Sequence, residues 1–305
     1  SQERMAVVIE AHEKEKFIKF CEAENIKAVE VAKVTDSGRM QMFWNGQKIV
    51  DLSRAFLDTS GCAKKQDAKV THLQEINSKS IEFNEENFYK ILADKNTASQ
   101  KGLVEMFDST VGATTVALPF GGKYQTTETE GCVQTLPILN AENIETVSYA
   151  SWGFDAEISK QNSMIGASLA VVESVAKIVA MGGNFRNIRL SFQEYFERLG
   201  NNPEKWGKPL ASLLGAYDAQ MNLGLAAIGG KDSMSGTYQD INVPPTLISF
   251  ACADGKKLNT ISPEFKKAGN FIYHFHHKTQ ENGLPNYQNL IEVFDYIHQG
   301  IQDKK

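Results

Sequence analysis

An apolar segment near the middle of the chain sets strong limits on the fold. Apolar residues recur at helical spacing from Met164 to Val179, and a Gly182-Gly183 pair follows them. This pattern predicts one long helix that is capped by Ser163 and largely buried. The helix lies within residues 103–253, where apolar runs and glycines are dense, as expected of a packed domain.

Other patterns in the same region combine helices with strands. The segment from Leu210 to about Leu223 predicts a second helix. Thr246 to Ala253 predicts a buried strand, since prolines precede it and Asp254-Gly255 follow it. We therefore expect an α+β fold in which a mixed or antiparallel sheet carries helices on one face, with partial α/β domains on either side.

The flanking segments predict smaller structures. Before residue 60 the expected elements are a helix from Glu13 to Glu24 and strands at residues 5–10, 28–34, 40–44 and 47–52. One helix on a few strands buries little surface, so this segment is expected to complete a sheet lying elsewhere. Residues 58–99 are polar and predict a linker with a short helix. A strand at residues 271–275 and a helix around residues 290–301 predict the start of a further domain.

Composition and charge exclude several classes of protein. Charged residues make up 23% of the chain and hydrophobic residues 42%, which indicates a globular protein. The formal net charge is -5 and there is no basic run, so nucleic acid and anionic membranes are not expected as partners. No stretch approaches the roughly 20 apolar residues of a membrane-spanning helix, and the four cysteines lack the spacing of zinc sites or disulfide frameworks. A cytoplasmic location is expected.

One motif has the composition of a phosphate-binding loop. It consists of Gly229, Gly230, Lys231, Asp232, Ser233, Met234 and Ser235. Backbone N–H groups beside a lysine and hydroxyls can hold a phosphate. The spacing is not that of a Walker motif, so the pattern fits a tight turn as well as a ligand-binding loop.

Three acidic residues have settings that indicate a role. Glu130 follows a polar strand, Glu173 lies in the apolar helix, and Asp254 follows the predicted buried strand. An unpaired carboxylate in an apolar setting is costly, so Glu173 needs a partner. That partner can be a magnesium ion held by several carboxylates, or Lys177 one helical turn later. Helical spacing alone favours the salt bridge. No covalent catalyst is indicated, and no catalytic residue is assigned.

Four motifs occur in an order that resembles a known enzyme family. They are FDSTVG at residues 107–112, GKYQT at residues 122–126, LSF at residues 190–192 and GKDSMS at residues 230–235. With SQERM at residues 1–5, the chain resembles large, multidomain phosphoribosylformylglycinamidine synthase (formylglycinamide ribonucleotide amidotransferase) over nearly its whole length. The resemblance is to an internal fragment of the synthetase region and is least distinctive from Gly61 to Ala98.

The resemblance implies a domain arrangement. The family contains two aminoimidazole ribonucleotide synthetase-like copies followed by a glutaminase domain. Residues 1–60 would end the first copy's C-terminal domain, residues 61–99 would be a linker, residues 100–254 would form the second N-terminal domain, and residues 255–305 would start the second C-terminal domain. The remaining domains of the same polypeptide would be partners. Without them an apolar sheet face or edge would be exposed, so self-association is expected.

The resemblance also implies an activity for the parent protein. That activity is an ATP-dependent ligation in de novo purine biosynthesis, which converts formylglycinamide ribonucleotide and glutamine to formylglycinamidine ribonucleotide and glutamate, with release of ADP and phosphate. ATP or ADP and magnesium would be the cofactors, and the fragment itself would be inactive. The alternative is a stand-alone nucleotide-binding or scaffold module of the same superfamily.

Carried over by position, the resemblance implies a nucleotide site. Lys101, placed with a one-residue shift, would meet the nucleotide, and Glu130, Glu173 and Asp254 would hold magnesium. The possible phosphate or substrate loop would consist of Gly230, Lys231, Asp232, Ser233 and Ser235. Lys177 stands where the family has an asparagine ligand, and Glu130 stands near where it has an aspartate. Without a gap, Gln134 takes that place instead. A lysine ammonium can replace one cation's charge, so fewer magnesium ions or weaker nucleotide binding are expected.

Overall fold

The computed structural model describes residues 4–59, 65–71, 76, 81–141 and 143–304. The chain divides into two units, Ser1–Lys65 and Gln66–Lys305, and each is described by itself. The first domain boundary predicted from the sequence, at residue 60, lies near this division. The boundaries at residues 99 and 254 stay predictions. Cys62 and residues 1–3 of the SQERM motif lie outside the described residues.

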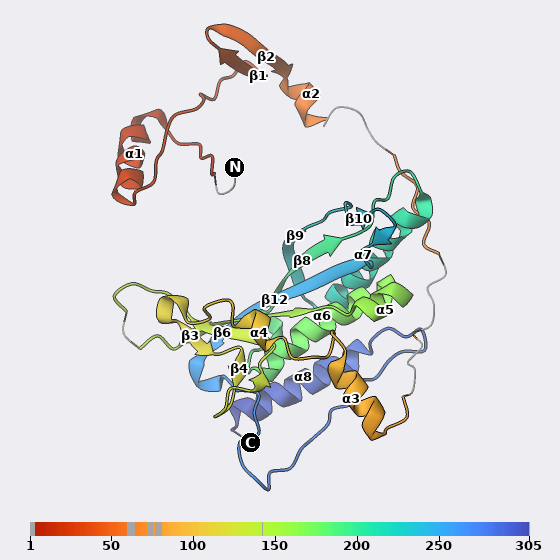
Figure 1. The fold of residues 1–305 in the computed structure, drawn as a ribbon. Coiled ribbons are helices and arrows are strands. Elements are labelled where there is room, and N and C mark those ends of the chain that lie inside the picture. The colour runs from red at the N-terminus through yellow and green to blue at the C-terminus, as the bar shows by residue number, and fades with distance from the viewer. Residues whose placement is uncertain (1–3, 60–64, 72–75, 77–80, 142, 305) are drawn as a thin grey trace. The chain divides into compact units, whose positions relative to one another are not determined.

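The smaller unit contains one β-hairpin, drawn in orange in Figure 1. Strand β1 (Arg39–Trp44) pairs antiparallel with β2 (Gln47–Ser53). Asn45 and Gly46 form the turn with φ values of 46° and 76°. Two left-handed residues match the twist of the strands, which is why Asn-Gly predicts this turn. The helices of this unit are η1 (Ala11–Glu13), α1 (Lys14–Ala23) and α2 (Arg54–Asp58).

The hairpin and α1 confirm the sequence predictions, but the strands predicted at residues 5–10 and 28–34 are wrong. Neither segment has regular structure, and their apolar side chains are exposed, with Val8 at 84% and Val31 at 83%. A strand needs a neighbour that satisfies its N–H and C=O groups. Among the described residues of this unit, β1 and β2 pair only with each other.

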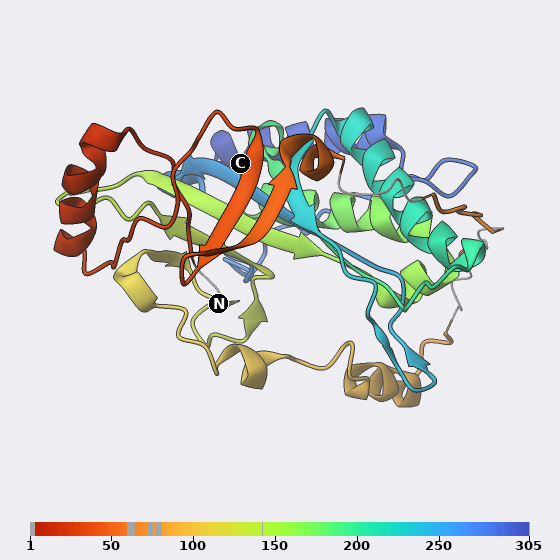
Figure 2. The same ribbon diagram turned by 90° about the horizontal axis from the view of Figure 1, so that it is seen from above.

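The larger unit is organised around a six-stranded sheet. Its strands, in spatial order, are β3 (Thr115–Ala117), β6 (Gly131–Thr135), β7 (Thr146–Gly153), β12 (Thr246–Lys256), β8 (Arg189–Tyr195) and β9 (Ala226–Lys231). All neighbours are antiparallel except β8 and β9, which are parallel. The two longest strands, β7 and β12, lie side by side at the centre (Figure 2). The sheet is therefore mixed and mostly antiparallel, as expected.

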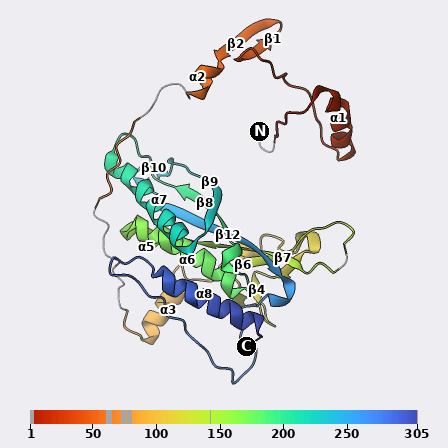
Figure 3. The same ribbon diagram turned by 180° about the vertical axis from the view of Figure 1, so that it is seen from behind.

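Helices cover one face of this sheet (Figures 1 and 3). Helix α6 (Ser163–Ala180) packs on β7 and β12, and α5 (Ala156–Gln161), α7 (Pro203–Leu223) and α8 (Tyr287–Gln302) pack on α6. Alternate residues of the central strands are buried under α6: Val147, Tyr149, Ser151 and Gly153 in β7, and Leu247, Ser249, Ala251 and Ala253 in β12. On the opposite face Trp152 is 48% and Phe250 42% exposed. The strand that was predicted to be buried is thus buried on one face only.

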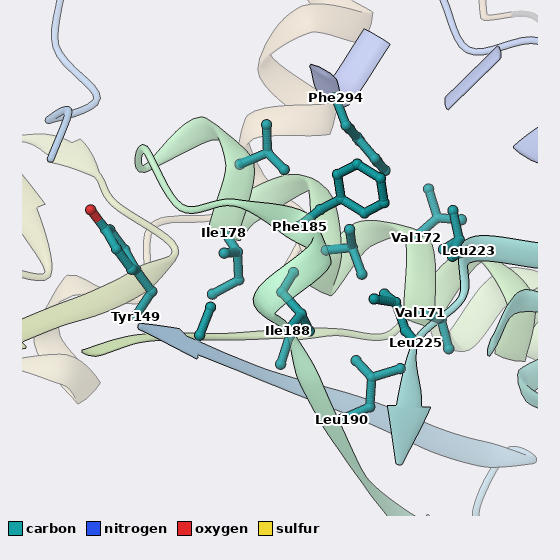
Figure 4. Close-up of a cluster of buried hydrophobic side chains, with 14 of the residues drawn as sticks. Tyr149, Val171, Val172, Ile178, Phe185, Ile188, Leu190, Leu223, Leu225 and Phe294 are labelled. Carbon is teal, nitrogen blue, oxygen red and sulfur yellow. The ribbon is translucent and has the colours of Figure 1, made fainter. Parts of the chain in front are cut away.

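Helix α6 forms the centre of the core. Its Val171, Val172 and Ile178 lie among aromatic and branched side chains from the sheet and from α8 (Figure 4). Its N-cap is Asn162, not Ser163 as predicted, because the Asn162 side-chain oxygen accepts a hydrogen bond from Ile165 N at 3.0 Å.

Helix α6 is long and apolar enough to cross a membrane, contrary to the expectation that no stretch has this length and composition. Among the described helices it alone meets this criterion. However, 67% of the segment is buried inside the protein, as in the core helix of a folded domain.

Helices α6 and α7 cross closely because Gly215 lacks a side chain. A Cβ at Gly215 would collide with the carbonyl oxygen of Met164, and the Ser168 hydroxyl donates to the Gly215 carbonyl oxygen at 3.0 Å. Helix α7 begins at Pro203, seven residues before the predicted start, and continues through Pro209. Pro203 at the first position costs little, because the first N–H groups of a helix lack partners within it, whereas Pro209 lies inside the helix and removes the N–H that would bond to the Lys205 carbonyl oxygen.

The remaining elements are short. They are α3 (Glu85–Ala93), α4 (Lys101–Val104), η2 (Val111–Ala113), β4 (Phe120–Gly121), β5 (Thr127–Glu128), η3 (Phe185–Asn187), β10 (Thr237–Tyr238), β11 (Ile241–Asn242) and η4 (Lys257–Asn259). Helix α3 confirms the helix predicted in the linker, and α8 confirms the closing helix. The strand predicted at residues 271–275 is wrong, because that segment has no regular structure. Tyr287, Leu290 and Phe294 of α8 share the core of the larger unit.

Candidate functional site

The predicted site residues Glu130, Glu173 and Lys177 meet at one end of α6. Lys177 Nζ lies 2.7 Å from Glu173 Oε1 and 2.9 Å from Glu130 Oε2, and it donates to the carbonyl oxygen of Trp152 at 3.1 Å. The ammonium also lies 4.2 Å from the centre of a Trp152 ring. The Lys177 side chain is 13% exposed, against 38% for Glu173 and 53% for Glu130. The salt bridge favoured by helical spacing is therefore present, and it includes a second carboxylate.

Local backbone geometry brings the three side chains together. Glu130 directly precedes β6 and has a φ of 54°, a left-handed conformation uncommon outside glycine. The neighbouring strand β7 ends at Gly153, where a Cβ would collide with the Ala170 carbonyl oxygen of α6. Beyond this close approach, Phe154 N donates to Glu173 Oε2 at 2.9 Å. Each oxygen of the Glu173 carboxylate thus has a partner, which fixes its position.

A cavity of about 220 Å³ opens beside this group. Glu128, Thr129, Glu130 and Lys177 line one part of it, and Ala180, Met181, Ile261, Ser262 and Pro263 line the rest. Ile261 N donates to the Met181 carbonyl oxygen at 3.0 Å, which fastens the segment after η4 to the end of α6. The Lys177 group therefore forms the polar wall of a small pocket.

Lys101 lines a second and larger cavity of about 450 Å³. Its Nζ donates to the Gln125 carbonyl oxygen at 2.9 Å, lies 3.6 Å from Glu105 Oε1 and lies 5.4 Å from the centre of the Phe120 ring. The FDSTVG motif contributes Phe107, Asp108 and Ser109 to the same cavity. Hydrogen bonds from the Thr110 side chain and backbone hold the pKa of Asp108 below its ordinary value.

The two cavities share the hairpin formed by β4 and β5. Phe120 and Gln125 line the larger cavity, and Glu128 lines the smaller. The Ser99 hydroxyl donates to Glu128 Oε1 at 3.3 Å, next to the start of α4. The sequence motifs at residues 107–112 and 122–126 therefore belong to one surface region, together with Lys101.

Asp254 is not part of this region. Gly131, Ser151 and Ala251 form one row across β6, β7 and β12, and Asp254 lies three residues farther along β12. At about 3.3 Å per residue this places it about 10 Å along the strand from that row. Its side chain instead accepts a hydrogen bond from Asn187 Nδ2 at 3.2 Å. In the described part of the chain no group of three acidic, histidine or cysteine residues is arranged to hold a metal ion.

The GKDSMS motif is the end of an edge strand and its continuation, rather than a turn. Gly230 and Lys231 belong to β9, and a Cβ at Gly230 would collide with the Phe192 carbonyl oxygen of β8. Beyond β9, Ser233 N donates to the Glu194 carbonyl oxygen at 3.2 Å, and the Ser233 and Ser235 hydroxyls lie 2.9 Å apart. The motif's glycine thus serves close strand packing. Its role as a phosphate or substrate loop stays a prediction.

Glu194 lies under this motif and was not predicted from the sequence. It is 6% exposed, and its Oε1 has no hydrogen-bond partner among the described residues. Burial, with a smaller effect of the Asp232 charge, raises the pKa of Glu194 to about 7. The contact of Trp152 with Lys177 was also not predicted. The sequence shows an aromatic residue directly before Gly153, but no spacing in the sequence links Trp152 to Lys177.

The comparisons with known proteins identify the fold. Residues 1–45 match the family model of the AIR synthase related protein, C-terminal domain. The structure of Thermotoga maritima PurL complexed with AMPPCP covers 99% of this chain and 45% of its own, with a TM-score of 0.68 at 18% identity. The structure complexed with FGAR covers 97% and 42%, with a TM-score of 0.67 at 15% identity. The chain has the AIR synthase-related fold, which confirms the predicted α+β class.

Two curated relatives are subunits of the same enzyme. The phosphoribosylformylglycinamidine synthase subunit PurL of Streptomyces avermitilis is 25% identical over 259 residues, which are 81% of this chain and 32% of that protein. PurL of Campylobacter lari is 25% identical over 280 residues, which are 90% and 36%. The chain is a relative of phosphoribosylformylglycinamidine synthase, as its motifs predicted. It spans about a third of the length of these relatives.

Proposed function

We propose that this chain is part of the synthetase region of a phosphoribosylformylglycinamidine synthase and that it contributes a nucleotide-binding surface. The parent protein would convert formylglycinamide ribonucleotide to its amidine in the cytoplasm, using ATP and ammonia from glutamine. The observation that carries this proposal is the agreement in fold over 97–99% of the chain with the structures of PurL complexed with FGAR and with AMPPCP.

The larger cavity is the proposed nucleotide site. Its volume of about 450 Å³ lies within the usual range of small-molecule pockets. Phe107 offers an aromatic surface to a base, since its side chain is 77% exposed. Lys101 supplies a positive charge for phosphate at the same wall. Lys177 and Glu130 lie on the other side of the shared hairpin, in the smaller cavity.

The remaining domains of the parent polypeptide are proposed to complete the reaction as partners of this chain. We propose the division into residues 1–60, 61–99, 100–254 and 255–305 for the parent protein. The chain alone would then bind nucleotide without completing the ligation.

Calorimetric titration of the chain with ATP tests the nucleotide site. Lys101→Ala removes a charge-assisted contact worth about 1.5–3 kcal/mol, so the Kd for ATP should rise about tenfold or more. Lys95→Ala is the matched control, because Lys95 is an exposed lysine six residues away that does not line the cavity. An equal Kd for wild type and Lys101→Ala, or no ATP binding by wild type, would contradict the proposal.

The stand-alone nucleotide-binding or scaffold module is the second candidate, favoured by the two cavities that the chain holds by itself. An antibody against this chain distinguishes the two functions in source cells. A protein band with a molecular mass several times that of the 305-residue chain supports the synthase. A band of the chain's own size supports the module.

A further inference from the structure

Lys177 is held as a bound cation would be. An ammonium group has three N–H donors and no acceptor. Three oxygens surround Lys177 Nζ: Glu173 Oε1 at 2.7 Å, Glu130 Oε2 at 2.9 Å and the Trp152 carbonyl oxygen at 3.1 Å. The Lys177 side chain as a whole is only 13% exposed, although it lines the smaller cavity. The donors of Lys177 are matched by protein oxygens.

The same oxygens are the kind that bind hard divalent cations. Magnesium and calcium take carboxylate and carbonyl oxygens as ligands. A divalent ion placed between Glu130 and Glu173 would stand within a few ångströms of the ammonium, where like charges repel strongly in a partly buried setting. The third expected ligand, Asp254, lies three residues away along β12 from the row of Gly131. The residues present do not fit the magnesium ion that the family resemblance implied.

We propose that Lys177 is a built-in cation that replaces a divalent metal between Glu130 and Glu173, so that this site excludes magnesium. An ordinary surface salt bridge would contribute little and would leave metal binding unchanged when broken. A built-in cation behaves differently. Its removal leaves two facing carboxylates and a carbonyl oxygen without a positive partner, and these attract a divalent ion.

A consequence for nucleotide binding rests on the function proposed above. If the chain takes ATP, Lys101 supplies the positive charge for its phosphates, and no metal is held between Glu130 and Glu173. ATP should then bind wild type equally well with magnesium or with a chelator present. The exclusion of metal itself does not depend on nucleotide.

Manganese titration followed by electron paramagnetic resonance tests the exclusion directly, because bound manganese loses the signal of the free ion. Wild type and Glu173→Gln should bind manganese equally, because the wild-type site between Glu130 and Glu173 holds none. Lys177→Gln keeps a long side chain and an oxygen but loses the charge, and it should gain one manganese per chain at concentrations at which wild type binds none at this site. Lys177→Arg keeps the charge and should gain none. Circular dichroism establishes that each variant is folded.

Two results would overturn the proposal. One is a manganese site in wild type that Glu173→Gln abolishes, and this arm needs no Lys177 variant. The other is a folded Lys177→Gln protein that binds manganese no better than wild type. The double variant Lys177→Gln/Glu173→Gln should lose the gained site. Failure of wild type to bind ATP would contradict the proposed function and leave the manganese result standing.

Discussion

Replacing Glu194 by glutamine should stabilise the protein in a pH-dependent way. Glu194 is 6% exposed, its Oε1 has no partner among the described residues, and burial is the main cause that raises its pKa to about 7 from an ordinary 4.5. The difference is about 2.5, and each pKa unit corresponds to about 1.4 kcal/mol. Ionising this side chain in the folded protein therefore costs up to about 3 kcal/mol.

The sign follows from proton binding. The folded protein holds the Glu194 proton more tightly than the unfolded chain does. Its contribution to stability is full below the unfolded pKa of 4.5 and is lost as pH rises through about 7. Glutamine resembles the protonated carboxyl and does not titrate. The variant should match wild type at about pH 4.5 and exceed its stability by up to about 3 kcal/mol at about pH 8.

Urea unfolding followed by circular dichroism measures this difference, since the helical signal comes mainly from the larger unit. Glu145→Gln is the matched control, because Glu145 is exposed and directly precedes β7 in the same unit. It should change stability little at either pH. The reasoning is refuted if Glu194→Gln changes the free energy of unfolding equally at both pH values, or if it destabilises the protein at the higher pH.

Three further predictions concern packing, the cap of α6 and association. Gly215→Ala should lower the free energy of unfolding by about 2–3 kcal/mol, because its Cβ meets the backbone of α6. Gly300→Ala in α8 should be neutral or stabilise by about 1 kcal/mol, because a Cβ there meets open space; equal losses in the two variants would contradict the close crossing. Asn162→Ala should cost about 1 kcal/mol in urea unfolding through loss of the α6 cap, and an unchanged midpoint would contradict that role. Wild type should self-associate with rising concentration in sedimentation velocity, and replacing Trp152 and Phe250 by serine should weaken this association; a monomeric wild type would refute it.

The elements predicted correctly have determinants within a few residues of one another. The left-handed pair Asn45-Gly46 specifies its hairpin locally, and the apolar period of α6 is a property of that segment alone. The wrong strands failed for the opposite reason. Residues 271–275 are as apolar as a strand, yet Phe271 is 86% exposed and the segment pairs with no strand among the described residues. The sequence pattern of a segment shows that it can form a strand, but a strand forms only where a second segment pairs with it.

The candidate site divides in the same way. Glu173 and Lys177 are one helical turn apart, so their contact followed from the spacing alone. Glu130 directly precedes β6, has a left-handed backbone conformation and contacts the same ammonium. This contact depends on how β6 pairs in the sheet, which the sequence does not show. Register also separates Asp254 from the other two carboxylates. Family resemblance placed all three acids in one set, whereas the fold brings Glu130 and Glu173 together at Lys177 and leaves Asp254 apart.

The backbone positions of the two acidic residues are set without the lysine. Glu173 lies in α6 and also accepts a hydrogen bond from Phe154 N, and Glu130 directly precedes β6. Two carboxylates and one ammonium leave a single net negative charge, and loss of the ammonium makes it two. Because the backbone on both sides is supported independently, such a change alters the charge of the site more than its shape. This separation of scaffold from charge is what lets one lysine decide whether the cation at this site is internal or is taken from solution.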